Sequence, residues 1–251
     1  MFWTKINTRL TTEELRKESS LSKAVYVLFP VLVYYLIKDI TEVILWAIIN
    51  LALNGASEDI LNKVSSMSGT LQGVIYGISL LVVLAVLRKC ATNEITFKED
   101  EKAKNNMSFL QILFITAVSL GVSIGLNYLF SFIGFTSSSQ QFSDVSNSQF
   151  DMNFYSGLIL YGIVSPFAEE VIFRGILYNR IKRMFPIALS VAVSALLFGL
   201  YHGNIVQGVY GTLMGLLIIF FYERYKTFMA PLIFHSVANL GVYVVTYVLW
   251  R

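Results

Sequence analysis

The stretch "FYSGLILYGIVSPFAEEVIFRGILYNR", residues 154–180, has the length and apolar character of a membrane-spanning helix, yet it carries two adjacent glutamates and an arginine. Ionisable side chains inside a membrane are costly and commonly mark function. The rest of the chain is similarly apolar, because 55% of its 251 residues are hydrophobic, only 14% are charged and the mean hydropathy is +0.64. The composition therefore predicts a polytopic membrane protein.

Hydrophobic segments long enough for membrane helices recur on both sides of this stretch. There are seven, at 24–54, 69–88, 107–135, 154–179, 186–202, 205–222 and 228–250. A helix satisfies its own backbone polar groups in lipid, whereas a β-barrel would need short alternating segments that this sequence lacks. The predicted fold class is an all-α polytopic membrane protein with about seven transmembrane helices.

Charged residues near the middle of the first segment leave its form open. Lys38, Asp39 and Glu42 interrupt it, so it is either one long tilted helix or two broken halves, which would bring the total to about eight helices. Lys38 and Glu42 lie four residues apart and share a helix face, which favours an internal ion pair facing the bundle. The alternative is an interfacial break or a contact with substrate.

Basic residues predict the orientation of the chain. Fifteen of the 19 Lys and Arg residues fall in every second loop, so the positive-inside rule places the N-terminus in the cytoplasm and the C-terminus outside. These residues are Lys5, Arg9, Arg16, Lys17, Lys23, Arg88, Lys89, Lys98, Lys102, Lys104, Arg180, Lys182, Arg183, Arg224 and Lys226. Only "HGN" joins the fifth and sixth segments, so we expect this pair to form a short hairpin whose tip stays within the membrane.

The chain divides into three predicted parts. Residues 1–23 form a cytoplasmic N-terminal segment without the cleavage pattern of a removable signal peptide, residues 24–150 hold the N-terminal transmembrane helices and loops, and residues 151–251 hold the C-terminal transmembrane core. Cys90 is the only cysteine, which excludes an internal disulfide and a cysteine metal cluster and predicts an ordinary apolar packing residue.

Both histidines of the chain, His202 and His235, fall in the apolar C-terminal part together with Glu169, Glu170 and Arg174. Residues four apart share a helix face, so Glu170 is expected to pair with Arg174 while Glu169 projects in another direction. A partly desolvated carboxylate suits a general base or acid. The alternative is that both glutamates only hold neighbouring helices together.

A second helix is expected to present an imidazole and an amide to one point, because His235 and Asn239 are four residues apart. Such a pair can polarise a carbonyl and stabilise an oxyanion, while Glu169 and His202 can hold and deprotonate a water. On straight helices His202 would lie roughly 24 Å from the cytoplasmic start of its helix and His235 only about 10 Å from the start of its own. Helix tilt or a buried hairpin is therefore needed to bring the two histidines together.

Three short motifs on successive apolar segments resemble those of the CAAX prenyl protease and bacteriocin-processing family of membrane peptidases, also called CPBP or Abi. They are "EEVIFR" at 169–174, "FGLYH" at 198–202 and "HSVAN" at 235–239, and the resemblance covers residues 155 to 245. It implies an intramembrane endopeptidase with its catalytic core in the last four helices. The implied catalytic residues are Glu169, His202, His235 and Asn239, and the implied supporting residues are Glu170, Arg174 and Phe198.

No cofactor is favoured, although the resemblance also admits a three-ligand zinc site made of Glu169, His202 and His235. Asn239 is a poor zinc ligand and a better amide donor, which favours the metal-independent mechanism. The expected partners are the lipid bilayer and a peptide or membrane-protein substrate, with no nucleic acid. Two other classes of protein stay open. One is a non-catalytic immunity or regulatory membrane protein with this fold. The other is an ion-coupled transporter, but the two halves of the sequence show no repeat of the kind many transporters have.

Overall fold

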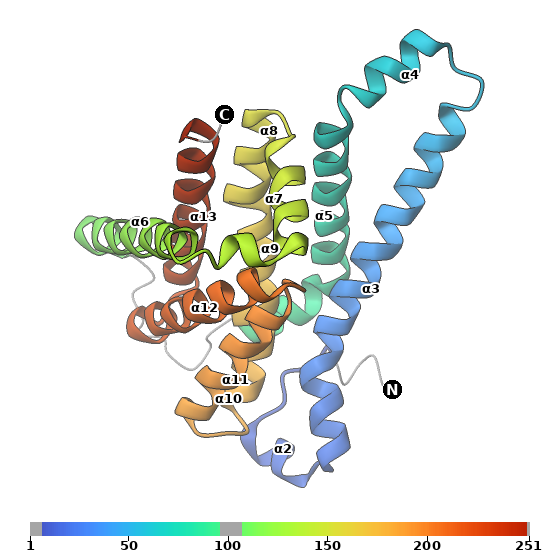
Figure 1. Cartoon of the computed structure of the whole chain (residues 1–251). Helices are drawn as coiled ribbons and strands as arrows, with labels where there is room; N and C mark the ends of the chain where they lie inside the picture. Colours follow the sequence, from blue (N-terminus) through green and yellow to red (C-terminus); the bar gives the residue numbers. More distant parts are fainter. Residues whose placement is uncertain (1–6, 96–106, 250–251) are drawn as a thin grey trace.

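The computed structural model describes residues 7–95 and 107–249, and within these residues all regular structure is helical (Figure 1). The elements in order are α2 (Thr12–Lys17), α3 (Ser20–Ala52), α4 (Glu58–Ser65), α5 (Ser68–Ile95), α6 (Phe109–Phe132), η1 (Thr136–Ser138), α7 (Gln140–Phe150), α8 (Phe154–Ile159), η2 (Leu160–Val164), α9 (Ser165–Glu170), η3 (Val171–Tyr178), α10 (Asn179–Lys182), α11 (Ile187–Leu200), α12 (Ile205–Tyr225) and α13 (Met229–Leu249). The pieces from α8 to α10 form one continuous helix, Phe154–Lys182, which we call the central helix. The predicted all-α polytopic class is confirmed.

Six helices of the described chain are long and apolar enough to cross a membrane. They are Ser20–Ala52, Ser68–Ile95, Phe109–Phe132, Phe154–Lys182, Ile205–Tyr225 and Met229–Leu249. The fifth predicted segment, 186–202, is only the 14-residue helix α11. At 1.5 Å per residue α11 is about 21 Å long, which is shorter than the hydrocarbon core of about 30 Å. The described chain therefore has six such spans and the shorter α11, where the sequence predicts about seven transmembrane helices.

The turn after α11 explains its early end. Gly203 has φ +74°, a left-handed conformation that glycine adopts readily, and the Asn204 side chain then caps α12 by accepting a 2.9 Å hydrogen bond from the Gln207 backbone. The two helices pack closely, since a Cβ placed on Gly215 would lie 3.2 Å from the Cα of Ala195. The predicted hairpin is confirmed, and the depth of its tip in the membrane stays a prediction.

The first predicted span is a single helix, so the broken alternative is wrong. α3 runs for 33 residues, roughly 50 Å, and continues through Pro30 near its beginning. A helix of this length must tilt to fit a bilayer, and Figure 1 shows α3 inclined against α5. Lys38 Nζ lies 2.7 Å from Asp39 and 3.3 Å from Glu42, which confirms the predicted ion pair between Lys38 and Glu42.

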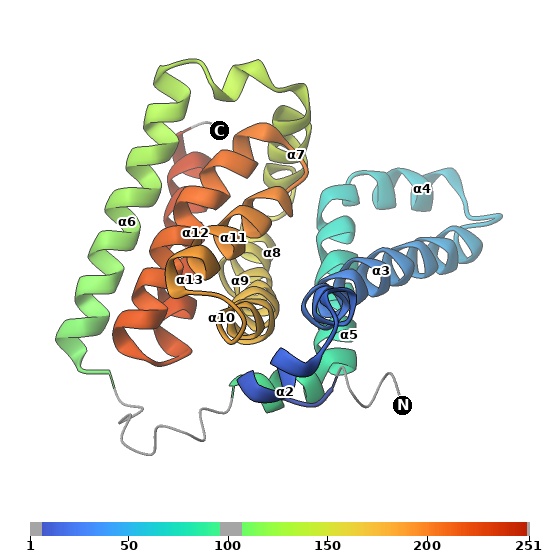
Figure 2. The ribbon, with the colours of Figure 1, turned by 90° about the horizontal axis from the view of Figure 1, so that it is seen from below.

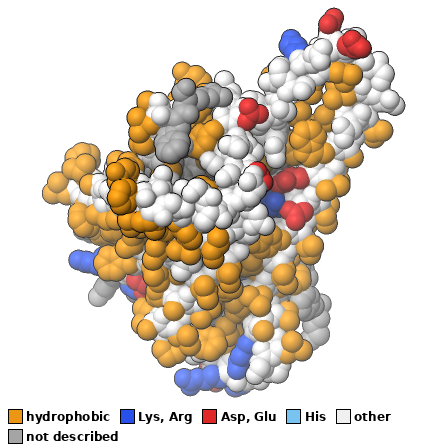
Figure 3. Space-filling model, in the orientation of Figure 1, with side chains coloured by type: hydrophobic (Ala, Val, Ile, Leu, Met, Phe, Trp, Pro, Cys, Tyr) orange, Lys and Arg blue, Asp and Glu red, His pale blue; other side chains and the backbone are white. Residues whose placement is uncertain are grey.

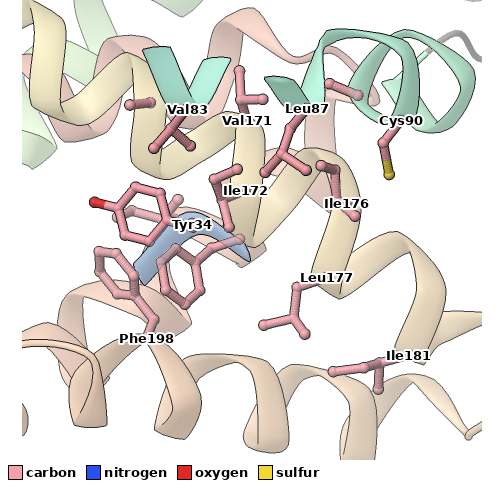
Figure 4. Packing of buried hydrophobic residues seen from close by; sticks show 14 of the residues in the cluster. Tyr34, Val83, Leu87, Cys90, Val171, Ile172, Ile176, Leu177, Ile181 and Phe198 are labelled. Atoms are coloured by element: carbon pink, nitrogen blue, oxygen red, sulfur yellow. The ribbon is translucent and has the colours of Figure 1, made fainter. Parts of the chain in front are cut away.

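The central helix is the core of the molecule. In the most apolar 18-residue stretch of this helix 61% of the residues are buried, compared with 17% in the corresponding stretch of α6 at the periphery. Figure 2, viewed from below, shows α3, α4 and α5 on one side of the central helix and α6, α12 and α13 on the other. In Figure 4, Ile172 and Ile176 of the central helix pack against side chains of α5 that include Leu87 and the fully buried Cys90.

Basic residues of several loops meet at one end of the bundle. Arg183 Nη2 lies 2.7 Å from Glu94 at the end of α5, and Lys182 Nζ lies 2.6 Å from Glu223 near the end of α12. Lys and Arg side chains are visible at this lower end of the space-filling view, below a wide apolar surface (Figure 3). This gathering agrees with the alternation on which the predicted orientation rests, and the orientation itself stays a prediction. Four of the fifteen basic residues lie outside the described residues, namely Lys5, Lys98, Lys102 and Lys104.

Candidate active site

The two adjacent glutamates of α9 point to different partners. Glu170 Oε1 lies 3.1 Å from Nη1 of Arg174, one helical turn further on, and both side chains are fully buried. Glu169 instead accepts a 2.6 Å hydrogen bond from the Ser165 hydroxyl, one turn earlier. The predicted Glu170–Arg174 pair is therefore confirmed, and Glu169 projects away from it as expected.

Glu170 also contacts α13. His235 Nδ1 lies 2.7 Å from Glu170 Oε1, while His235 Nε2 lies 3.7 Å from Glu169 Oε2. A carboxylate only accepts hydrogen bonds, so the proton of this contact sits on Nδ1 of the imidazole. Glu170 thus orients the ring so that its second nitrogen is directed toward Glu169.

The ring of Phe198 contacts Arg174 and both histidines. The guanidinium carbon of Arg174 lies 4.1 Å from the centre of the Phe198 ring, in cation–π geometry. The same ring meets His202 at 5.2 Å and His235 at 5.6 Å between ring centres, both nearly perpendicular. The aromatic residue of the "FGLYH" motif therefore packs between both histidines and the buried arginine.

His202 lies in the turn just after α11 and is held by the end of that helix. Its Nδ1 is 3.0 Å from the backbone oxygen of Phe198, and because a carbonyl can only accept, Nδ1 carries the proton and Nε2 has a free lone pair. The short α11 places His202 beside Phe198 and hence near His235. The separation of the histidines expected from straight helices does not occur.

Asn239 lies one turn after His235 and is fixed by an irregularity of the central helix. In the π-helical stretch η2, the Ser165 N–H donates to Leu160 O, and Pro166 has no N–H, so Tyr161 O lacks a helical partner. Asn239 Nδ2 donates to this oxygen at 3.1 Å. One further N–H of the Asn239 amide remains for another acceptor.

One cavity collects the predicted catalytic residues. Glu169, His202, His235 and Asn239 all line a cavity of about 610 Å³, as does Phe198. Glu170 and Arg174, which are fully buried, lie behind this lining. A carboxylate, two imidazoles and an amide around one cavity can hold a water, take its proton and stabilise a developing oxyanion.

Several polar residues near the site are not part of the motifs. Ser165 could have been found from its spacing of four residues to Glu169. The hydroxyls of Tyr34 and Tyr201 are hydrogen-bonded to each other, and Tyr35 donates to the backbone oxygen of Tyr201 at 3.0 Å. These contacts join α3 to the end of α11 across more than 160 residues, so no local pattern predicts them.

The donor arrangement does not fit a metal centre. Among residues 7–95 and 107–249, no three His, Cys, Asp or Glu side chains are grouped as metal ligands. Hydrogen bonds to Phe198, Glu170 and Ser165 orient the two histidines and Glu169, as they also would around a metal, but the three side chains are not grouped closely enough to share one ion. We therefore derive no step through zinc, and metal dependence is left to the experiment below.

Two comparisons with known proteins find similar sequences. Residues 151–241 match the sequence model of the family described as Type II CAAX prenyl endopeptidase Rce1-like, and this range includes all three motifs. The chain is also 28% identical over 176 residues to "Putative membrane peptidase YdiL" of Bacillus subtilis (strain 168), which covers 68% of this chain and 70% of that protein. No solved structure matches the chain. The resemblance to the CAAX prenyl protease family is thereby confirmed.

Proposed function

We propose that this chain is a membrane-embedded endopeptidase that hydrolyses a peptide bond of a peptide or membrane-protein substrate with a water activated by Glu169 and His202. The observation that carries the proposal is the convergence of Glu169, His202, His235 and Asn239 on one cavity, although they come from the central helix, the α11–α12 turn and α13. The family match over 151–241 supports a membrane protease. Specificity for a prenylated CAAX motif is one arm of the test below.

In this proposal the nucleophilic water lies between Glu169 and Nε2 of His202. Glu169 takes one proton from the water, and the oxygen attacks the carbonyl carbon of the scissile bond. When the C–N bond breaks, Glu169 returns that proton to the leaving amine. Ser165, which donates to Glu169 Oε1, keeps the carboxylate facing the cavity.

His235 and Asn239 would stabilise the oxyanion. Glu169, Glu170 and Arg174 together carry one net negative charge, which a single proton on His235 would neutralise within the buried group. His235 in this form donates from Nδ1 to Glu170 and from Nε2 into the cavity. The second N–H of Asn239 supplies another donor to the same oxygen.

The test is cleavage by the detergent-purified chain, with Glu169→Gln compared with wild type and with the control Glu58→Gln on the exposed helix α4. Substrates are quenched peptides, a prenylated CAAX peptide and membrane-protein extracts, each with and without a chelator. We expect wild type and Glu58→Gln to cleave and Glu169→Gln to lose at least about 100-fold in rate, because a general base contributes about 10² to 10⁴.

Other outcomes of this experiment would contradict parts of the proposal. Full activity of Glu169→Gln would remove Glu169 from the chemistry. Loss of cleavage under chelation, restored by zinc, would assign the reaction to a metal. An inert wild type on every substrate would favour the non-catalytic membrane partner instead.

A further inference from the structure

The cavity reaches only one end of the bundle. Glu169 lies near the middle of the central helix, and the lining beyond it comes from the beginning of α5, the end of α6, α7 and the end of α13. Examples are Gln72, Asn127, Ser146, Gln149 and Thr246. In Figure 1 the beginning of α5 and the end of α13 lie at the upper end and α7 lies in the upper half, while α6 crosses at mid-height. The helices α2 and α10 lie at the lower end, where basic residues gather.

Buried side chains close the other end. The central helix continues from Glu169 toward the lower end with side chains that are fully buried. Glu170, Ile172, Arg174 and Ile176 are all 0% exposed. Figure 4 shows this packing between the central helix, α5 and Phe198. Because this core fills the lower half, water and substrate reach Glu169 from the end where α7 lies.

The lining of the cavity suits the backbone of a polypeptide. Besides Asn239 of the candidate site, four carboxamides on four different helices line it, namely Gln72, Asn127, Gln149 and Gln207. A carboxamide both donates and accepts, as does each peptide unit of an extended chain. Within the described residues, no side-chain hydrogen bond engages Gln72, Asn127 or Gln149. A cavity of about 610 Å³ has the size of a small-ligand site, so it admits a short extended segment and excludes a folded domain.

The charges of the lining exclude recognition of a chain end by its carboxylate. Among the described lining residues the only lysine or arginine is Lys38, and its ammonium group already pairs with Asp39 and Glu42. The proposed charge on His235 is likewise paired, with Glu170, so the described lining residues offer no unpaired cation of the kind that a terminal carboxylate would require. The lining instead favours an internal segment.

From these observations, and resting on the endopeptidase function above, we propose that the site takes an internal, extended segment from the side of the membrane opposite the basic loops. By the positive-inside rule that side is the outer one. The segment is held through its backbone by the carboxamides Gln72, Asn127, Gln149 and Gln207. The substrate class is thus an exported or membrane-anchored polypeptide whose cleavage site lies at the outer half of the bilayer.

The side of access is tested with a membrane-impermeant maleimide on intact cells and on inverted vesicles. Ser146→Cys lines the cavity, Asn147→Cys lies on the same helix but faces solvent, and Thr12→Cys lies on α2 at the basic end. We expect Ser146→Cys and Asn147→Cys to react in intact cells and Thr12→Cys to react only in inverted vesicles. Wild type, whose buried Cys90 is shielded, serves as the blank.

The same variants link access to catalysis. Labelling of Ser146→Cys should abolish cleavage, and a substrate peptide should slow that labelling, whereas Asn147→Cys should show neither effect. Reaction of Ser146→Cys only in inverted vesicles, or cleavage unchanged after its labelling, would overturn the proposal. Labelling by maleimide does not depend on catalysis. If the endopeptidase function were wrong but the side of access right, Ser146→Cys would still react in intact cells while the protein cleaved no substrate.

Backbone recognition is tested with Gln149→Leu and Gln72→Leu, with Gln141→Leu as the matched control because Gln141 is exposed and outside the lining. Loss of one neutral hydrogen bond should raise KM about threefold to tenfold with kcat nearly unchanged. An N-methyl group on the peptide backbone should weaken wild-type binding similarly. Unchanged KM in both variants would refute the assignment of the carboxamides.

Discussion

His235 and Glu170 are 65 residues apart in the chain, yet their side chains are joined by a 2.7 Å hydrogen bond between Nδ1 and Oε1. This contact makes Glu170 the link between Arg174 on one side and the cavity-lining imidazole on the other. The second glutamate of the motif therefore has a role different from the first. Glu169 lines the cavity, whereas Glu170 determines which nitrogen of His235 faces it.

Replacing Glu170 by Gln should lower kcat at least about 100-fold with a small change in KM. The amide keeps the size of the side chain, but it no longer fixes the tautomer and charge of His235, and loss of the orienting carboxylate costs up to about 10⁴ in a comparable triad. Steady-state kinetics on the cleaved substrate measure this. A rise in KM with unchanged kcat would mean that Glu170 acts in substrate binding instead.

Ser165→Ala should lower kcat about 10-fold or more, because a hydrogen bond to a charged group contributes about 1.5–3 kcal/mol. The Ser165 hydroxyl donates to Glu169 at 2.6 Å, and without it the carboxylate loses its orientation toward the cavity. Ser165→Thr keeps the hydroxyl and should retain most of the activity. Equal activity of the two variants would show that this hydrogen bond does not matter for catalysis.

Arg174→Met should destabilise the folded chain by about 3–5 kcal/mol, because removing one partner leaves a buried charge uncompensated. The Arg174 guanidinium is fully buried, pairs with Glu170 and stacks on Phe198. The double variant Arg174→Met with Glu170→Gln should recover part of this loss, since both charges are then absent. Thermal unfolding in detergent measures the series, and strictly additive effects would argue against the coupling.

Cys90 should resist maleimide in the folded chain and react fully after denaturation. Its side chain is 0% exposed and its sulfur lies 2.8 Å from Nη2 of Arg180 within the core between α5 and the central helix. The fraction labelled against denaturant concentration then reports unfolding of this core. Rapid labelling under native conditions would show that the lower end of the bundle opens locally.

Contacts between residues four apart could be predicted because they depend only on helix geometry. Glu170–Arg174 and Lys38–Glu42 are of this kind, and both form as expected. The bounds of α11 agree with the predicted segment 186–202 to within two residues, but its 14 residues are too few to cross the bilayer as a full span. The turn at Gly203 and the Asn204 cap end the hydrophobic segment before it spans a membrane.

By itself the sequence determined the membrane class, the helical fold and the identity of the candidate residues, because apolar length, helical spacing and three ordered motifs are local properties. Only the tertiary structure decided that His235 meets Glu170, that Asn239 caps Tyr161 O and that the cavity leads to one end of the bundle. Such contacts depend on how separate helices cross and on which backbone groups they leave unpaired. These features arise from packing across the whole chain, which no segment encodes alone.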